Sequence, residues 1–155
     1  MTEVTKEFRP DGGVVVGDDG SENAALAVGY AVEEAQRRGS TLHVLRAWSI
    51  LSTSRPSDLP PGVAPSLEEY AESCREQEQW RLAKLVGDDP PVPVEVHPVH
   101  APAAQALITA SETADVVVVG SRGVGGFRSL VLGSVAEQVL RHACGPVIVV
   151  RDRRA

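Results

Sequence analysis

The residue pattern with the clearest chemical potential is a glycine-rich segment in the last third of the chain. The valine run Val116–Val119 is followed by Gly120 and Gly123, and Gly133 and Ser134 then open an apolar helical pattern. Glycines let backbone N–H groups come close to a ligand, and a helix N-terminus adds unpaired N–H donors and partial positive charge. A buried strand, a glycine-rich loop and a helix N-terminus in this order predict an anion site, with phosphate as the expected ligand.

Two other nucleotide-binding motifs do not fit the chain. A P-loop requires Gly-x4-Gly-Lys-Ser/Thr, and the sequence contains no Gly-Lys pair. The segment Gly123–Arg128 approaches the dinucleotide-binding spacing, but Arg128 stands where the third glycine is required, and the segment follows the fourth expected strand rather than the first. Neither GTPase nor NAD chemistry is therefore supported.

Ser134 has two expected roles. With Glu137 three residues later it has the spacing of a capping box, in which Ser134 is the N-cap and Glu137 lies at the third helical position. Its hydroxyl can also donate to a phosphate oxygen while it accepts from the backbone. Because glycine-rich loops between a strand and a helix also occur as plain turns, the residue types alone leave a phosphate site and a structural turn as alternatives.

Alternating strand and helix patterns must position this loop. The expected strands are Gly13–Gly17, Thr41–Trp48, Val92–Val99, Asp115–Gly120 and Pro146–Val150. The expected helices begin at Ser21 and end before Gly39, run from Ser66 or Ser73 to about Val86, and cover Ala101–Thr113 and Ser134 to about Ala143. Pro93 and Pro98 restrict their strand to a sheet edge. The order predicts one α/β domain with a five-stranded, mostly parallel sheet, helices on both faces and a Rossmann-like fold.

The domain is expected to have its core at about residues 12–151, with flexible tails at 1–11 and 152–155. In open α/β sheets, ligands bind beyond the carboxyl ends of the strands, where the strand order reverses. Three segments are therefore expected to meet there: Gly17–Ser21, the strand end around Ala47, and the loop Gly120–Ser134.

Composition limits the function classes. The chain has 155 residues, 43% of them hydrophobic, and a formal net charge of −6. The negative charge argues against nucleic acid or an anionic membrane as the main partner. Cys74 and Cys144 lie far apart without a metal-ligand spacing, so neither a zinc site nor a disulfide framework is expected. No secretory signal and no apolar run of about 20 residues is present, which predicts a cytoplasmic protein.

The chain resembles the universal stress protein family over nearly its whole length. The turn Asp19–Ser21 stands where the family has an Asp-Gly-Ser-like turn, and Leu45–Trp48 is similar to the family's Leu-Val-His-Ala-Trp. The spacing Gly-x2-Gly-x9-Gly-Ser from Gly120 to Ser134 matches the family's ATP loop at every glycine. The resemblance implies an ATP-binding, UspA-like protein with an adenine nucleotide α-hydrolase-like fold.

The resemblance also implies roles for individual residues. Asp19 would meet the ribose or help to place a metal, the backbone at Ala47 would meet the adenine edge, and Arg122 would add charge. Gly120 and Gly123 would admit the ribose and phosphates, and Gly133, Ser134 and the Val135 N–H would hold the phosphate tail. Mg²⁺ would arrive with the nucleotide, held largely by phosphate oxygens and water. The full expected set is Gly17, Asp18, Asp19, Ala47, Gly120, Arg122, Gly123, Gly133, Ser134 and Val135.

Several residues depart from the pattern or lie outside it. Asp18 stands where a hydrophobic or small residue is common in the family, and a second carboxylate near a triphosphate is repulsive unless Mg²⁺ bridges it. His97 and His100 alternate with apolar residues and are expected to face solvent, whereas His43 is expected on a face of the sheet or in the core. No metal-binding set of side chains is expected.

The expected function is that of a nucleotide-dependent stress regulator. No catalytic residue is expected, and any ATPase activity should be slow, because the loop offers Arg122 or Arg128 but no lysine and no carboxylate besides Asp18 and Asp19. A nucleotide-independent interaction or scaffold protein is the main alternative. An adenylate-transferring enzyme fits less well, since the chain has no further domain for a second substrate and no Ser-Gly-Gly-x-Asp-Ser-type loop.

The last expected strand bears on assembly. Pro146–Val150 is apolar and lies at a sheet edge in this topology, which makes it prone to pair with another strand. Family members commonly form homodimers through this strand. The alternative is internal packing, with the charged residues 151–154 preventing association.

Overall fold

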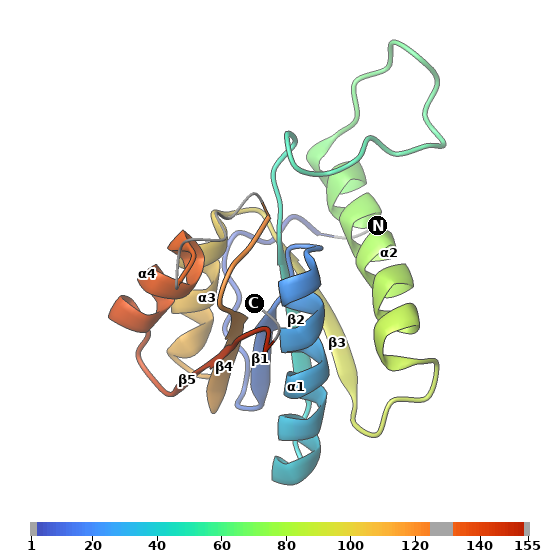
Figure 1. The fold of residues 1–155 in the computed structure, drawn as a ribbon. Coiled ribbons are helices and arrows are strands. Elements are labelled where there is room, and N and C mark those ends of the chain that lie inside the picture. Colours follow the sequence, from blue (N-terminus) through green and yellow to red (C-terminus); the bar gives the residue numbers. More distant parts are fainter. Residues whose placement is uncertain (1–2, 125–131, 154–155) are drawn as a thin grey trace.

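The computed structural model describes residues 3–124 and 132–153 of the chain. Five strands form one sheet in the order β3-β2-β1-β4-β5, and every pairing between neighbours is parallel (Figure 1). The strands are β1 Val14–Gly17, β2 Leu42–Ala47, β3 Val94–Val99, β4 Val116–Gly120 and β5 Val147–Val150. The helices are α1 Glu22–Arg38, α2 Leu67–Val86, α3 Ala103–Ser111 and α4 Ser134–His142. The predicted α/β fold class is confirmed.

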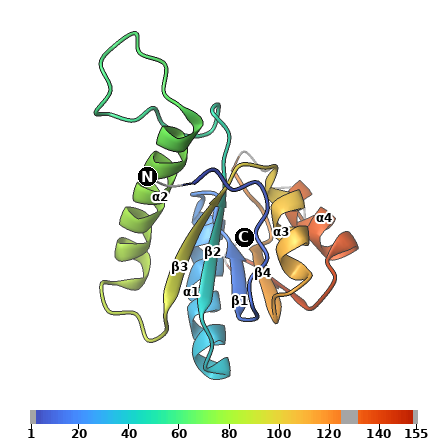
Figure 2. The same cartoon turned by 180° about the vertical axis from the view of Figure 1, so that it is seen from behind.

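The sheet is covered on both faces because its strands are apolar on both sides. Alternate residues of the central strands point in opposite directions, so Val14 and Val16 pack with α1, whereas Val15 packs with α3 and α4. Figures 1 and 2, which view the molecule from opposite sides, show α1 lying over one face and α3 and α4 over the other. Val14, Val15 and Val16 are fully buried. This packing fixes the strand ends that surround the site.

The strand order reverses between β1 and β4, which are adjacent in the sheet. From β1 the chain proceeds outward through β2 to β3, and it then returns to β4 and continues to β5 on the other side. The connections that leave β1 and β4 therefore go to opposite faces, and a crevice forms at their carboxyl ends. Both strands end in a glycine, Gly17 and Gly120.

The first two helices begin as their sequences predict. The Ser21 side chain accepts a hydrogen bond from the Ala24 N–H at 3.0 Å, and Gly39 ends α1 in the left-handed conformation at φ 62°. Of the two candidate starts of α2, the structure selects Ser66, which forms a complete capping box with Glu69.

Other elements are shorter at their ends than expected, by one or two residues. α3 begins at Ala103 instead of Ala101, because Pro102 has an extended backbone, with ψ 139°, and serves as its N-cap. β3 begins at Val94 rather than Val92, and it lies at a sheet edge as its prolines predict. Val92 is nevertheless buried beside the core.

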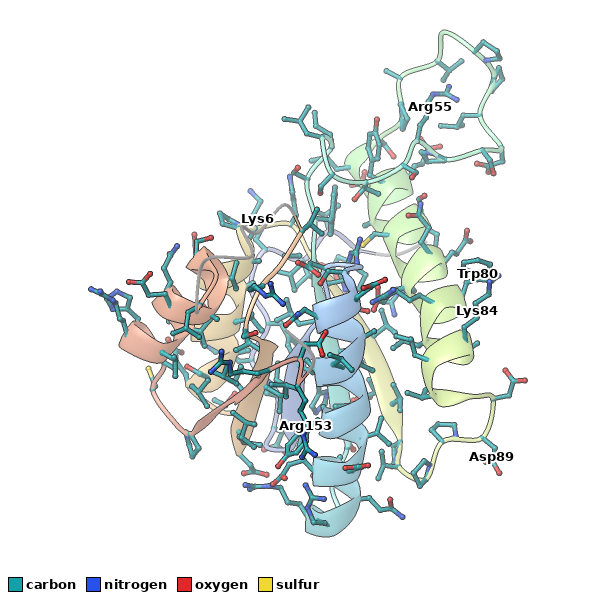
Figure 3. All side chains as sticks on the ribbon, viewed as in Figure 1. Lys6, Arg55, Trp80, Lys84, Asp89 and Arg153 are labelled. Atoms are coloured by element: carbon teal, nitrogen blue, oxygen red, sulfur yellow. The ribbon has the colours of Figure 1, made fainter. Side chains whose placement is uncertain are left out.

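The connection from β2 to α2 projects from the body of the protein (Figure 1). Arg55 stabilises it by donating hydrogen bonds to the carbonyls of Leu59, Pro60 and Val63. Figure 3 shows Arg55 inside this loop and Trp80 and Lys84 together on the outer side of α2, where the ammonium lies 3.5 Å from the indole centroid. Within the described residues, no helix combines the length and the apolar character that a membrane span requires.

The N-terminal segment, expected as a flexible tail, contacts the sheet and α3 in its described part. The Thr5 carbonyl accepts from the His100 N–H at 2.7 Å, and the Phe8 ring stacks on His97 with centroids 3.8 Å apart. Arg9 Nε forms an ion pair with Glu112 just beyond α3, at 2.6 Å. Residues 3–12 thus cross the β2–β3 side of the sheet before entering β1.

Candidate functional site

One cavity at the carboxyl ends of the strands is lined by all ten residues that were expected to contact the nucleotide. Its volume is about 410 Å³, within the range of pockets that hold small-molecule ligands. The residues come from the turn after β1, the end of β2, the loop after β4 and the start of α4. Expected Arg128 lies outside the described residues.

Gly17 allows α3 to approach the end of β1. A Cβ at this position would lie 3.0 Å from Leu107 Cδ1, which is closer than ordinary van der Waals contact. Leu107 therefore reaches the cavity, where it forms part of an apolar wall with Leu45 and Val119. This wall can accept a flat, weakly polar group.

Asp19 joins the two loops of the site. Its Oδ1 accepts from the Ser21 N–H at 3.0 Å, and its Oδ2 accepts from the Val124 N–H at 3.0 Å. Gly123 permits this contact, since a Cβ there would lie 2.6 Å from Asp19 Oδ2. A glycine is therefore required at position 123 for the Asp19 carboxylate to keep this position.

The loop after β4 is also held from α1. Asn23 Oδ1 accepts from the Ser121 hydroxyl at 3.1 Å and from the Arg122 N–H at 3.4 Å. The Gly133 N–H donates to the Ser121 carbonyl at 2.6 Å, so the loop returns to its own beginning immediately before α4. The first and last described residues of the loop are consequently fixed next to each other.

The predicted capping box at Ser134 is wrong. Gly133 is the N-cap, with an extended backbone (φ −74°, ψ 168°), and its carbonyl accepts from the Glu137 N–H at 3.0 Å. Ser134 is therefore the first helical residue, where its hydroxyl makes no capping bond. The N–H groups of Ser134, Val135 and Ala136 have no acceptor within the helix itself. These residues line the cavity, and their N–H groups carry the partial positive charge of the helix N-terminus.

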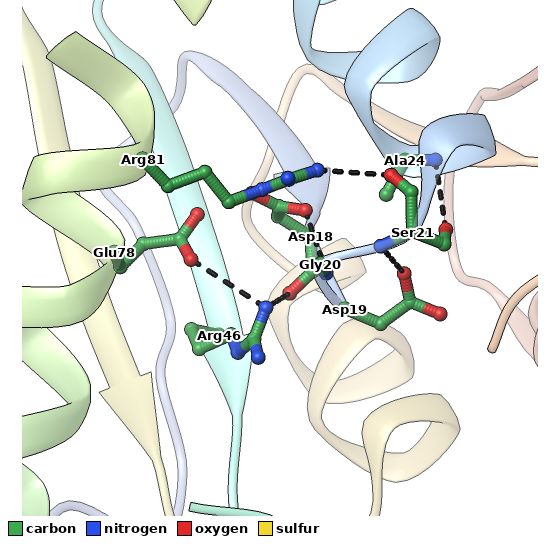
Figure 4. A network of polar contacts seen from close by, with 8 residues as sticks. All are labelled: Asp18, Asp19, Gly20, Ser21, Ala24, Arg46, Glu78 and Arg81. Carbon is green, nitrogen blue, oxygen red and sulfur yellow. Dashed lines mark hydrogen bonds and ion pairs between the residues drawn. The ribbon is translucent and has the colours of Figure 1, made fainter. Parts of the chain in front are cut away.

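Asp18 lines the cavity, but its carboxylate is directed toward α2 (Figure 4). Asp18 Oδ1 accepts from the Gly20 N–H at 3.0 Å, and Oδ2 forms an ion pair with Arg81 Nε at 2.8 Å. Its side chain is completely shielded from solvent. The repulsion expected between this carboxylate and a phosphate is therefore countered by a guanidinium.

Glu78 completes this buried group of charges. Burial raises the pKa of Glu78 to about 9, and the adjacent Asp18 carboxylate adds to the shift. Burial works against ionisation of Asp18 as well, but hydrogen bonds from Glu78 and Arg81 outweigh it and lower the pKa of Asp18. At neutral pH these shifts favour a protonated Glu78 beside an ionised Asp18. Arg46 Nη1 lies 3.6 Å from Glu78 Oε2 and donates to the Asp18 carbonyl at 3.3 Å.

Sequence reasoning missed part of the cavity lining and the residues that support it. The missed lining residues are Ala24, Leu45, Ala103, Leu107, Val119, Val124 and Ala136. Leu45 could have been found, because it lies two residues before Ala47 and therefore on the same face of β2. Leu107, Glu78 and Arg81 come from helices whose rotation about their axes depends on packing.

The expectation that His97 and His100 face solvent is wrong. His97 is stacked under Phe8, and the His100 ring stacks on Trp48 with centroids 4.3 Å apart. The N-terminal segment and the loop after β2 supply these partners, which a strand pattern does not reveal. His43 is buried on a face of the sheet, as expected.

Comparisons with known proteins agree with the fold. A model of the universal stress protein family matches residues 13–151. A universal stress protein of Mycolicibacterium smegmatis is 39% identical over 140 residues, which are 90% of this chain and 46% of that protein. The chain therefore spans about half the length of this curated relative.

Two solved structures share the architecture. The universal stress protein UspA from Lactobacillus plantarum superimposes with a TM-score of 0.68 at 22% identity, covering 94% of this chain and 100% of that one. A universal stress protein in complex with cAMP superimposes with a TM-score of 0.62 at 24% identity, covering 90% and 96% of the two chains. At these identities both structures support the fold.

Proposed function

The chain belongs to the universal stress protein family, and we propose that it is an ATP-binding regulator that hydrolyses its nucleotide slowly or not at all. The observation that carries this proposal is a cavity whose lining combines two chemically different parts. Ser134 and Val135 contribute the first turn of α4, whose N–H groups have no acceptor within the helix, and Leu45 and Leu107 contribute apolar side chains.

These two parts of the lining suit the two parts of an adenine nucleotide. The amides at the start of α4 would hold phosphate oxygens, because they offer hydrogen bonds and partial positive charge together. The adenine would lie along the apolar wall, with the backbone at Ala47 at its polar edge. The relative bound to cAMP shows that an adenine nucleotide is a ligand of at least one protein with this fold.

Mg²⁺ fits the proposal as a companion of the nucleotide. Asp19 is the carboxylate best placed to help it, since Asp18 is already paired with Arg81. Most of the coordination would come from phosphate oxygens and water, as is usual for this ion. The ion would lower the repulsion between the phosphates and Asp19.

Slow or absent hydrolysis follows from the chemistry of the lining. The described lining residues include no lysine and no histidine. Asp18 is ion-paired, and Asp19 already accepts two backbone hydrogen bonds. Neither carboxylate is therefore free to orient a water molecule against a terminal phosphate. We propose that ATP binding, rather than hydrolysis, is the functional event, and that it changes the conformation of the loop that follows β4.

The proposal includes a homodimer formed through β5. All four residues of this strand are half-buried, and within the described chain its outer edge pairs with no other strand. A second copy could continue the sheet there by strand pairing. The proposed site of action is the cytoplasm, where adenine nucleotides are available.

A nucleotide-independent scaffold is the second candidate function. The contact between Asp19 and the Val124 N–H favours it, because this carboxylate already occupies a loop amide that a ligand could use. In that case the loop would act as a fixed surface for a protein partner.

The deciding experiment is to denature freshly purified protein, identify any released nucleotide by chromatography, and titrate the stripped protein with ATP, with and without Mg²⁺. We expect saturable ATP binding that Gly123→Ala weakens, because the added Cβ would displace Asp19. Gly29→Ala is the matched control, since its Cβ would meet nothing within 4 Å. Absence of both released nucleotide and saturable binding would favour the scaffold function. In a parallel titration, tighter binding of cAMP than of ATP would identify cAMP as the preferred ligand.

A further inference from the structure

Three side chains with metal-ligating atoms converge on the side of the sheet that the N-terminal segment crosses. His43 of β2 and Glu95 of β3 are register partners on neighbouring strands, and His97 lies two residues beyond Glu95 on the same face. His43 Nδ1 is 3.0 Å from His97 Nε2 and 3.2 Å from Glu95 Oε2. One ligand atom from each residue lies within 4.8 Å of those of the other two.

We propose that His43, Glu95 and His97 bind a divalent transition-metal cation, with Zn²⁺ as the best match. The site would use His43 Nδ1, one Glu95 carboxylate oxygen and His97 Nε2, and water would complete the coordination. None of these residues lines the proposed nucleotide cavity. The inference is therefore independent of the proposed function.

The spacing of the ligand atoms suits a tetrahedral ion. With bonds of about 2.0–2.1 Å, neighbouring ligands of tetrahedral Zn²⁺ lie about 3.3–3.4 Å apart. The two short separations around His43 Nδ1, 3.0 and 3.2 Å, need to open only slightly to admit the ion, and the third, between the Glu95 carboxylate and the His97 ring, lies within 4.8 Å. Two imidazoles and one carboxylate also form a donor set typical of zinc sites that keep an open position for water.

The surrounding structure holds two of the three ligands in place. The parallel pairing of β2 with β3 fixes the backbone of all three residues. His97 is stacked under Phe8, and the Phe8 centroid lies 5.5 Å from that of His43. A side chain at Gly13 would lie 3.1 Å from the His43 ring and 2.8 Å from the Thr41 carbonyl, so the glycine leaves room for the imidazole. Ligands held in this way need little rearrangement to bind.

Access and charge fit the same inference. The Glu95 side chain is 57% exposed, whereas that of His43 is 10% exposed, so an ion would enter from solvent past the carboxylate. The carboxylate would neutralise part of the ionic charge, and the partly enclosed rings would supply neutral nitrogen ligands. Without an ion, the same three groups can share one proton through hydrogen bonds around His43 Nδ1. Metal binding measurements separate these two arrangements.

The test uses untagged full-length protein that has been stripped with a chelator. Zn²⁺ is titrated by calorimetry and by competition with a chromophoric chelator, and native mass spectrometry gives the stoichiometry. Co²⁺ serves as a second probe, because a tetrahedral site absorbs visible light far more strongly than the octahedral aquo ion. We expect one ion per chain and a tetrahedral Co²⁺ spectrum.

The variants assign the ion to these residues. Glu95→Gln preserves the size of an exposed side chain, and we expect it to weaken Zn²⁺ binding by at least about tenfold, with a larger loss for His97→Gln. Glu68→Gln, at another exposed glutamate, should bind as the wild type does. The double variant His142→Gln/Cys144→Ser should also retain binding, which excludes the exposed thiol and its neighbour.

Circular dichroism and thermal unfolding establish that each variant is folded. Because Glu95 is exposed, its variant keeps the test valid even if His97→Gln does not fold. Zn²⁺ binding that is unchanged in Glu95→Gln, binding that disappears in His142→Gln/Cys144→Ser, or no binding by the wild type would each overturn the proposal.

Discussion

The Asp19 carboxylate accepts a hydrogen bond from the Val124 N–H at 3.0 Å, and this contact joins two segments that are 105 residues apart in the chain. The turn after β1 is thereby attached to the loop after β4, across the point where the strand order reverses. Any ligand that competes for the Val124 N–H or the Asp19 carboxylate alters this link.

Removing the Asp19 carboxylate should release the loop. We expect Asp19→Ala to increase amide hydrogen exchange at Val124 and to destabilise the fold by about 1 kcal/mol, because the N–H groups of Ser21 and Val124 lose an acceptor. Hydrogen exchange and urea unfolding measure the two effects. Asp89→Ala, at an exposed aspartate in the loop before β3, is the control. Unchanged exchange at Val124 would contradict the proposed link.

Adding a methyl group at Gly17 should disturb the apolar wall. Gly17→Ala would place a Cβ 3.0 Å from Leu107 Cδ1, so the leucine must shift within the cavity. We expect weaker adenine nucleotide binding and a stability loss of about 1–3 kcal/mol, as is typical of overpacking. The same change at Gly29, which has open space in α1, should instead stabilise the helix by up to about 1 kcal/mol. Nucleotide titration and thermal unfolding compare the two variants.

Two serines at helix starts should respond differently to loss of the hydroxyl. Ser21→Ala removes the cap of α1 and should cost about 1 kcal/mol in the free energy of unfolding. Ser134→Ala should change stability by less than about 0.5 kcal/mol, since this hydroxyl makes no capping bond. If the N-terminus of α4 holds phosphate, ATP binding should nevertheless be weaker in Ser134→Ala than in the wild type. A capping-sized stability loss in Ser134→Ala would contradict the assignment of Gly133 as the N-cap.

The buried Glu78 should make stability depend on pH. Its pKa is about 9 in the folded protein, above the usual value of 4.5, so the folded state keeps a proton that the unfolded state releases. The stabilising contribution is complete below about pH 4.5 and is lost progressively as the pH rises through 9.

Glu78→Gln tests this dependence because glutamine stays neutral. Between pH 6 and pH 9 we expect the wild type to lose at least about 1 kcal/mol more stability than the variant. Urea unfolding at several pH values measures the difference, and Glu76→Gln on the exposed side of α2 should follow the wild type. Parallel pH profiles for wild type and Glu78→Gln would show that Glu78 ionises normally.

The outer edge of β5 provides a selective test of the proposed homodimer. Val117 and Ser121 donate from β4 to the carbonyls of Pro146 and Val150, so the backbone groups of the intervening Val149 point to the open edge. Val149→Pro removes an N–H from that edge without removing a bond to β4. We expect monomers by analytical ultracentrifugation while the circular dichroism spectrum stays that of the wild type. A variant that remains dimeric would place the interface elsewhere.

The linear pattern of residues was sufficient to predict the order of the elements and ten of the residues that line the cavity. Valine runs such as Val116–Val119 are apolar enough to form buried strands, and the glycines that end β1 and β4 mark the strand ends. Parallel strands bring their carboxyl ends to one edge of the sheet. Residues at these ends, such as Asp19 and Ala47, are therefore neighbours whatever the details of packing.

The directions of individual side chains depend on contacts that form only when the whole domain is folded. Asp18 turns toward α2 because Arg81, 63 residues away, offers a guanidinium there, and His97 is enclosed because Phe8 returns across the sheet. Gly133, the N-cap of α4, donates a hydrogen bond to the Ser121 carbonyl at the start of the same loop. These contacts join segments that are distant in the chain or separated by a loop. Local sequence patterns carry no information on such pairings, because strand register and helix rotation are set by packing of the whole domain.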